Sequence, residues 1–225
     1  NYEAFKDKTA IIVSAGPSLN YEYDNLRYIK ENQLAYIFSV GSSINSLIEN
    51  DILPDAAFTF APTEKNNVVF EKVKKREISN IPLVFGSTAN HESIQDYPGK
   101  LYHMITTQDT VSPFVMKDTE LKVVSDASSI AVVTFQVLAN LGFKRIILVG
   151  QNLAYQDDKI YADGIGYSPS YSKIKMLPIK DVEGNEVYTH EGFNNMRKHL
   201  EMYIKSAPNI DVFNTSKGGA AIDGA

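Results

Sequence analysis

The chain has 225 residues, of which 44% are hydrophobic and 22% charged, and its formal net charge is −5. This composition is typical of a globular protein and argues against wholesale disorder. The negative charge disfavours non-specific binding to a nucleic-acid backbone, which needs a concentrated positive field. The chain has no cysteine, which excludes disulfides, cysteine metal sites and thiol nucleophiles.

The sequence has no apolar run of about 18 residues and no signal peptide, so we expect no membrane span. It begins at Asn1 without an initiator Met and ends at Gly224-Ala225. We therefore expect one domain over residues 1–225, excised from a longer chain. The absence of cysteine is compatible with a cytoplasmic location.

Several short apolar segments are expected to form strands. Each is bounded by Gly, Pro or polar residues and lacks alternation, which is typical of parallel strands buried on both faces. They are Thr9–Ser14, Ala35–Val40, Ala56–Phe60, Pro82–Phe85, Lys144–Val149 and Ile210–Phe213.

Helical patterns lie between these strands. They cover Asn25–Asn32, Ser42–Asn50, residues 64–76, Ser128–Leu141 and Glu191–Lys205. The alternation predicts an α/β fold: a Rossmann-like, doubly wound, mostly parallel sheet with helices on both faces. In such folds ligands bind beyond the carboxyl ends of the strands. Residues Asp181–Tyr188 are expected to form a small hairpin that turns at Gly184-Asn185.

The loop after the first expected strand reads Gly16-Pro17-Ser18-Leu19. Gly16 allows close approach of the backbone to a ligand, and Ser18 is of a type that caps helices. A helix that starts here offers unpaired N–H groups to a phosphate. The loop is neither GxGxxG nor a P-loop, so a plain strand-to-helix turn is the alternative.

Two further loops and one helix start are weaker candidates. Gly41 and Ser42 follow the second strand, where a helix cap explains them equally well. Pro62 follows the third strand and would either line a base or sugar pocket or form a turn. Ser128 and Ser129 stand before the long helix, where a phosphate would meet the positive helix end, although ordinary capping explains one of them.

Gln151 and Asn152 follow the strand that ends at Val149, and Tyr155 and Tyr161 come next. Phenols donate hydrogen bonds to a leaving phosphate without carrying charge, although a loop tyrosine is more often a packing residue. His190 precedes the last long helix, and none of the four histidines has metal-ligand spacing, so no metal site is expected. The glycine-rich segment Asn214–Ala220 is expected at the edge of the same cleft.

Three loops in this order, Gly16–Leu19, Gly150–Tyr155 and Asn214–Gly224, resemble the central domain of motility accessory factor proteins, the bacterial flagellin glycosyltransferases. The resemblance spans nearly the whole chain. It implies transfer of a nonulosonic acid, pseudaminic or legionaminic, to Ser or Thr of flagellin. The chain departs from that family at Lys217, where Glu is common, and at Ala61, where Asp often precedes the proline. Because of the second departure, neither a functional carboxylate nor a metal is expected at that loop.

The chain is also similar to bacterial CMP-sialic acid sialyltransferases. Their Gly-Pro-Ser-Leu loop, helix-start hydroxyls and tyrosine pair match Gly16–Leu19, Ser128-Ser129, and Tyr155 with Tyr161. The likeness implies that CMP lies among these loops, that the tyrosines assist departure of its phosphate, and that His190 is the general base. It also implies an inverting transfer without a metal. The CMP-sugar is then a donor substrate, and no cofactor is expected.

Two other functions remain open. An archaeal pterin diphosphokinase shares this type of domain and transfers diphosphate from ATP with Mg²⁺. Asp157, Asp158 and Asp163 are available for such chemistry, but their spacing does not require a metal. The third reading is a non-catalytic module that binds a nucleotide or a sugar. For the transferase, the expected partners are a nucleotide-sugar and flagellin, with no nucleic acid.

Overall fold

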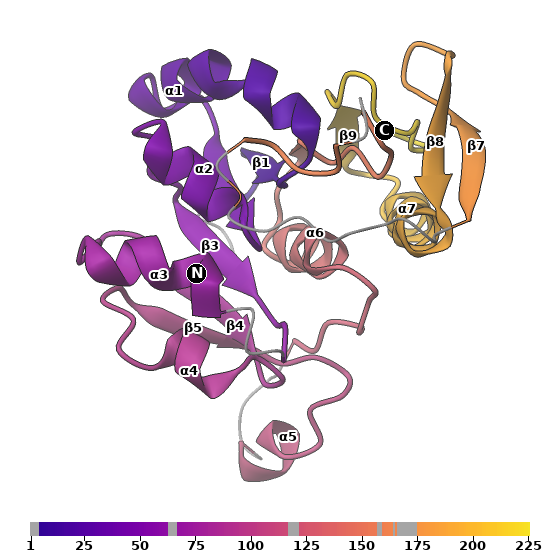
Figure 1. Ribbon diagram of the computed structural model, residues 1–225. Helices are drawn as coiled ribbons and strands as arrows, with labels where there is room; N and C mark the ends of the chain where they lie inside the picture. The colour runs from indigo at the N-terminus through magenta and orange to yellow at the C-terminus, as the bar shows by residue number, and fades with distance from the viewer. Residues whose placement is uncertain (1–4, 63–66, 117–121, 157–158, 164, 166–174) are drawn as a thin grey trace.

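A computed structural model describes residues 5–62, 67–116, 122–156, 159–163, 165 and 175–225 (Figure 1). Seven parallel strands form one sheet in the order β5-β4-β3-β2-β1-β6-β9. They are β1 (Thr9–Val13), β2 (Tyr36–Val40), β3 (Ala56–Thr59), β4 (Leu83–Gly86), β5 (Leu101–Met104), β6 (Arg145–Val149) and β9 (Asp211–Asn214).

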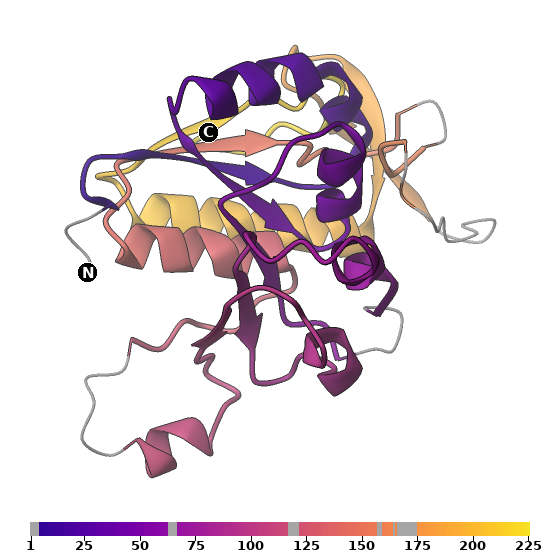
Figure 2. The same cartoon turned by 90° about the vertical axis from the view of Figure 1, so that its left-hand side faces the viewer.

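The helices cover both faces of this sheet. They are α1 (Tyr23–Glu31), α2 (Ser43–Glu49), α3 (Asn67–Lys75), α4 (His91–Ile94), α5 (Ser112–Val115), α6 (Ile130–Asn140) and α7 (Glu191–Ser206), with a 3₁₀ turn, η2 (Pro17–Tyr21). Figure 2 shows α6 and α7 side by side on one face and α1 on the other. The expected Rossmann-like, doubly wound, parallel α/β fold is confirmed.

The central strands are apolar because both of their faces are covered. In β1, Ile12 packs with α6 residues on one face, whereas Ile11 and Val13 pack with α1 residues on the other. Leu138 of α6 and Leu26 of α1 are at most 1% exposed and represent the two layers. This double burial accounts for strands that lack alternation.

Two expectations about secondary structure need correction. Strand β5 was missed, because Leu101, Tyr102 and His103 are exposed at the sheet edge and leave no apolar run. The hairpin exists, but its strands are β7 (Met176–Lys180) and β8 (Glu186–His190), with the turn between them. Gly184, with φ 88°, lies in that turn as expected.

The hairpin lies beside the start of α7 (Figure 1). Backbone hydrogen bonds join it to the segment after β6 and to the C-terminal segment. The Tyr155 amide donates to the Tyr188 carbonyl at 2.8 Å, and the Ala221 amide donates to the Lys180 carbonyl at 2.9 Å. No helix in the described part of the chain has the length and apolar character needed to cross a membrane.

Candidate functional site

The site is positioned by the place where the strand order reverses. The chain continues from β1 to β2 on one side and from β6 to β9 on the other. The strand order therefore reverses between β1 and β6. In open α/β sheets, ligands bind in the crevice at this switch point. Here the two loops are joined by backbone bonds: Gly16 donates to the Gly150 carbonyl at 2.8 Å, and Ser14 donates to that of Val149 at 2.8 Å.

Asn152 is a buried polar residue that links these two loops. Its Oδ1 accepts hydrogen bonds from the backbone N–H of Ser18 at 3.0 Å and from Ser18 Oγ at 2.7 Å. Because a backbone N–H only donates, the oxygen of the amide must face Ser18. The Nδ2 group therefore points elsewhere, and it has no hydrogen-bond partner among the residues that the structure describes.

An unpaired buried NH₂ group is costly, because its lost hydration is not replaced. Asn152 is only 2% exposed. Such exceptions in folded proteins need an explanation, and a ligand that supplies an acceptor atom provides one. The same geometry corrects one expectation: Ser18 does not cap a helix, because its hydroxyl and amide are both directed to Asn152.

Gly16 is required because the two loops approach closely. A Cβ atom at this position would lie 2.4 Å from Asn152 Oδ1 and 2.4 Å from the Gly150 carbonyl oxygen. The next residues serve the fold: Pro17 opens the 3₁₀ turn, and Leu19 is fully buried in the core beneath α1. Of this motif, Ser18 is hydrogen-bonded to Asn152, and Gly16 leaves the space that Asn152 Oδ1 occupies.

We expect Gly16→Ala to lower the free energy of unfolding by about 1–3 kcal/mol, the usual cost of overpacking. We expect this loss of stability because the Gly150 carbonyl belongs to the backbone and cannot move aside as the end of a flexible side chain can. Gly184→Ala is the control. An alanine there would be strained by the φ of 88°, but no atom lies within 4 Å of the added Cβ. Urea unfolding of both variants checks this; a loss at position 16 no greater than at 184 would refute the crowding.

The C-terminal loop is hydrogen-bonded to Gln151 and Asn152. Ser216 Oγ accepts from the Gln151 amide at 2.9 Å, and the Ala220 amide donates to the Asn152 carbonyl at 2.7 Å. Asn214 ties the two ends of this loop together, accepting from the Ser216 amide at 3.0 Å and donating to the Ala220 carbonyl at 3.3 Å. The three motifs singled out in the sequence thus meet at Asn152.

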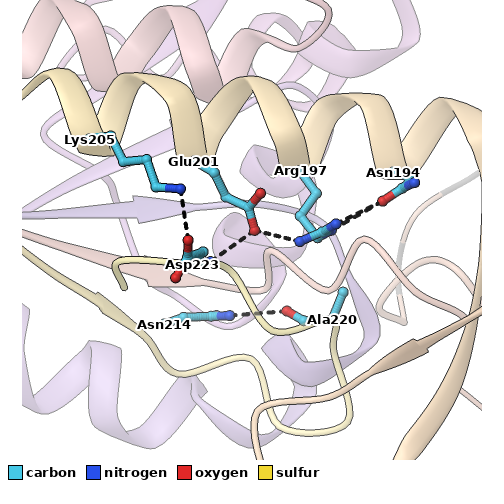
Figure 3. Close-up of polar contacts among 7 residues, drawn as sticks. All are labelled: Asn194, Arg197, Glu201, Lys205, Asn214, Ala220 and Asp223. Carbon is cyan, nitrogen blue, oxygen red and sulfur yellow. Dashed lines mark hydrogen bonds and ion pairs between the residues drawn. The ribbon is translucent and has the colours of Figure 1, made fainter.

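Side chains of α7 hold the segment that follows this loop (Figure 3). Glu201 accepts from the Asp223 amide at 2.9 Å and forms an ion pair with Arg197. Arg197 also donates twice to Asn194 Oδ1, at 3.2 and 3.0 Å. Lys205 pairs with the Asp223 carboxylate at 2.8 Å. These contacts fix the far end of the loop that presents Ser216 to Gln151.

Tyr155 and His190 lie together at the base of the hairpin. Their ring centroids are 5.9 Å apart, and Phe193 of α7 packs against both rings. Burial raises the pKa of the Tyr155 phenol and lowers the pKa of His190. Both side chains are therefore uncharged near neutral pH, the phenol as a hydrogen-bond donor.

Tyr161 belongs to a segment that returns to the first loop. The Ala162 amide donates to the Ala15 carbonyl at 2.8 Å, and the Asp163 amide donates to Asn20 Oδ1 at 3.1 Å. Tyr161 itself is half-buried. Tyr155 is thus tied to the hairpin, whereas the residues that follow Tyr161 are tied to the loop after β1.

Ser128 and Ser129 lie at the start of α6, away from the first turn of α7. Ser129 caps α6 through the Ala131 amide at 3.2 Å, as ordinary capping predicts. Ser128 Oγ is 2.9 Å from Nδ1 of His199, which is nine residues beyond His190. Nine helical residues rise about 13 Å, so Ser128 meets α7 well below the level of His190 and Tyr155. A phosphate-binding role for this pair stays a prediction.

The remaining predicted residues line neighbouring strand ends. Gly41 has φ 54°, and Ser42 is 6% exposed, although its side chain makes no cap bond. Pro62 is exposed at the end of a described segment, and residues 63 and 64 of the same loop lie outside the described residues.

Asn45 on α2 was missed by sequence reasoning. It is 6% exposed, and its Oδ1 has no partner within the described ranges. The available signal was a carboxamide inside the otherwise apolar pattern of Ile44, Leu47 and Ile48. Buried amide groups of this kind, like that of Asn152, are candidates for ligand contacts.

The acidic residues give little support for a metal. Asp157 and Asp158 lie outside the described residues. Asp163 is engaged by Lys159 at 3.5 Å and by Asn20 Nδ2 at 3.2 Å. Within the described ranges, no three His, Asp or Glu side chains gather closely enough to hold an ion. A separate cavity of about 560 Å³ lies at the opposite edge of the sheet, where Thr9 and Tyr36 begin their strands.

Comparison with known proteins adds a fold relative and a family. The chain is similar to the MAf glycosyltransferase from Magnetospirillum magneticum AMB-1, with a TM-score of 0.71 and 17% identity. The match covers 98% of this chain and 35% of that protein, and at this identity the likeness shows the fold alone. No curated protein matches the chain. The family model described as "6-hydroxymethylpterin diphosphokinase MptE-like" matches residues 1–158, so the chain belongs to the MptE-like family.

Proposed function

We propose that this chain is a glycosyltransferase that moves a nonulosonic acid from a CMP-sugar to a Ser or Thr hydroxyl, with flagellin as the acceptor protein. One observation carries the proposal: the buried Nδ2 group of Asn152 at the switch point has no partner among the described residues and calls for a ligand acceptor. Phosphate and pyrimidine carbonyl oxygens are such acceptors. The likeness in fold to the MAf glycosyltransferase supports glycosyl transfer, and the resemblance in sequence to CMP-sialic acid sialyltransferases suggests the donor.

In this reaction the bond between the anomeric carbon and the phosphate oxygen breaks. Its electron pair goes to the phosphate, giving CMP, while the acceptor oxygen forms the new bond to carbon and loses its proton. We propose that Tyr155 and Tyr161 donate hydrogen bonds to the phosphate as it gains charge. Prearranged donors act most strongly on charge that develops in the transition state. We propose inversion at the anomeric carbon and no role for a metal.

The family match favours a second candidate, diphosphate transfer from ATP to a pterin. It covers residues 1–158, which include the loops after β1 and β6 and hence Gly16 and Asn152. The same orphaned amide would then contact an ATP phosphate. This chemistry uses Mg²⁺ held by oxygen ligands, and Asp163, which accepts a hydrogen bond from Asn20 beside the first loop, is one available carboxylate. A non-catalytic nucleotide-binding module is the third candidate.

Thermal unfolding with added nucleotides separates these candidates. We expect CMP to raise the Tm by roughly 5–10 °C at about a hundred times its Kd, because a ligand that binds only the folded state stabilises it. UDP should shift it less. A larger shift with ATP and Mg²⁺ than with CMP would favour the diphosphokinase, and no shift with any nucleotide would contradict both enzymes.

A further inference from the structure

His190 is built into the start of α7 as its N-cap. Its Nδ1 accepts a hydrogen bond from the Gly192 amide at 3.1 Å and a longer one from the Phe193 amide at 3.4 Å. An N-cap side chain normally accepts from the second or third amide of its helix in this way. The lone pair on Nδ1 is therefore used by the backbone.

This contact decides where the imidazole carries its proton. Nδ1 cannot bear hydrogen while two backbone N–H groups point at it, so the proton of the neutral ring is on Nε2. Protonation to imidazolium is opposed by the same two amides and by the positive end of the α7 dipole. Burial acts in the same direction, because it lowers the pKa of His190.

The ring is also held in place sterically. Its centroid is 4.1 Å from that of Phe193, and Tyr155 packs against it from the hairpin side. A Cβ atom on Gly192 would lie 2.9 Å from His190 Cε1 and 3.1 Å from Nδ1. The ring can turn over only by breaking the cap, so both its orientation and its tautomer are fixed before a ligand arrives.

We propose that His190 acts as a neutral Nε2–H hydrogen-bond donor to the anionic part of the donor substrate, and not as the general base expected from sequence resemblance. This proposal rests on the proposed transferase function. A base at Nε2 needs a free lone pair there, and the cap places hydrogen on that atom. The proton of the acceptor hydroxyl then goes to another group. The departing CMP phosphate, a monoester whose second pKa is about 6, is an acceptor that the reaction itself supplies.

The tautomer is measurable without activity. Long-range ¹H–¹⁵N correlation spectra of the histidine-labelled 225-residue chain distinguish the two ring nitrogens, and the spectrum of His190→Asn assigns the signals. In spectra recorded between about pH 7 and pH 8, we expect a neutral ring that is protonated at Nε2. A ring protonated at Nδ1, a charged ring, or averaging between tautomers would overturn the proposal.

Addition of CMP tests the donor role separately from the function. We expect the Nε2–H signal of His190 and the Asn152 amide signal to shift together. If Asn152 shifts and His190 does not, the donor role fails. If neither shifts, CMP does not bind in the crevice and the proposed function fails, whereas the tautomer result stands.

A matched pair of variants gives the kinetic test. Asn and Asp have the same shape and both cap helices well, so His190→Asn and His190→Asp should fold alike. Asn retains an N–H donor, and Asp offers only acceptors but could serve as a base. We expect the Asn variant to transfer sugar at least tenfold faster than the Asp variant. The reverse order would restore the general-base role.

Discussion

The double substitution Tyr155→Phe and Tyr161→Phe should reduce turnover by about 10²–10⁴-fold while changing the Kd for CMP by less than about threefold. In the proposed mechanism each phenol supplies one donor to the leaving phosphate, and loss of one such donor typically costs about 10²–10³ in kcat. The effect falls on kcat because the phosphate gains its charge only in the transition state. Steady-state kinetics with CMP-sugar and calorimetric titration with CMP measure the two quantities.

Tyr188→Phe is the matched control for this pair. Tyr188 is 50% exposed on the hairpin, and its hydroxyl has a contact of 3.4 Å with Glu186. Removing that exposed hydroxyl should barely change the stability of the fold and should leave both turnover and CMP affinity within about twofold of the unmodified chain. Unchanged glycosylation in the Tyr155 and Tyr161 double variant would defeat their assignment, and so would an equal loss in the Tyr188 control.

Asn152→Asp should weaken CMP binding by more than about 100-fold in a protein that still folds. The carboxylate keeps an oxygen that accepts from the amide and hydroxyl of Ser18, so the link between the two loops survives. The two N–H donors are lost, and an acceptor with negative charge faces the phosphate in their place. A lost hydrogen bond to a charged group costs about 1.5–3 kcal/mol, and like charges in contact add to it.

The control for this substitution is Asn140→Asp, the same chemical change at an exposed position at the end of α6. It should leave CMP affinity unchanged within error. Circular dichroism should show that both variants retain the fold. If Asn152→Asp binds CMP as tightly as the unmodified chain, the orphaned amide does not contact the nucleotide. The buried Nδ2 group of Asn152 would then no longer support the proposed function.

The sequence by itself determined the layers of this protein. Strands buried on both faces are rich in apolar residues, and Ala10–Val13 and Ile146–Val149 are unbroken apolar runs in the sequence. The alternation with helices fixed a parallel sheet, and hence the edge at which to look for a ligand. Strand β5 escaped because an edge strand such as Leu101–Met104 has no second covered face to select apolar residues.

Only the tertiary structure decided which polar groups are already paired. Ser18 looks like a helix cap in sequence, yet its partner is Asn152, which lies 134 residues away. His190 looks like a base, yet the helix it begins uses Nδ1 as a cap. Hydrogen bonds between distant loops form only when strand order brings the loops together. That the Nδ2 group of Asn152 lacks a partner within the described ranges is likewise visible only in the folded chain.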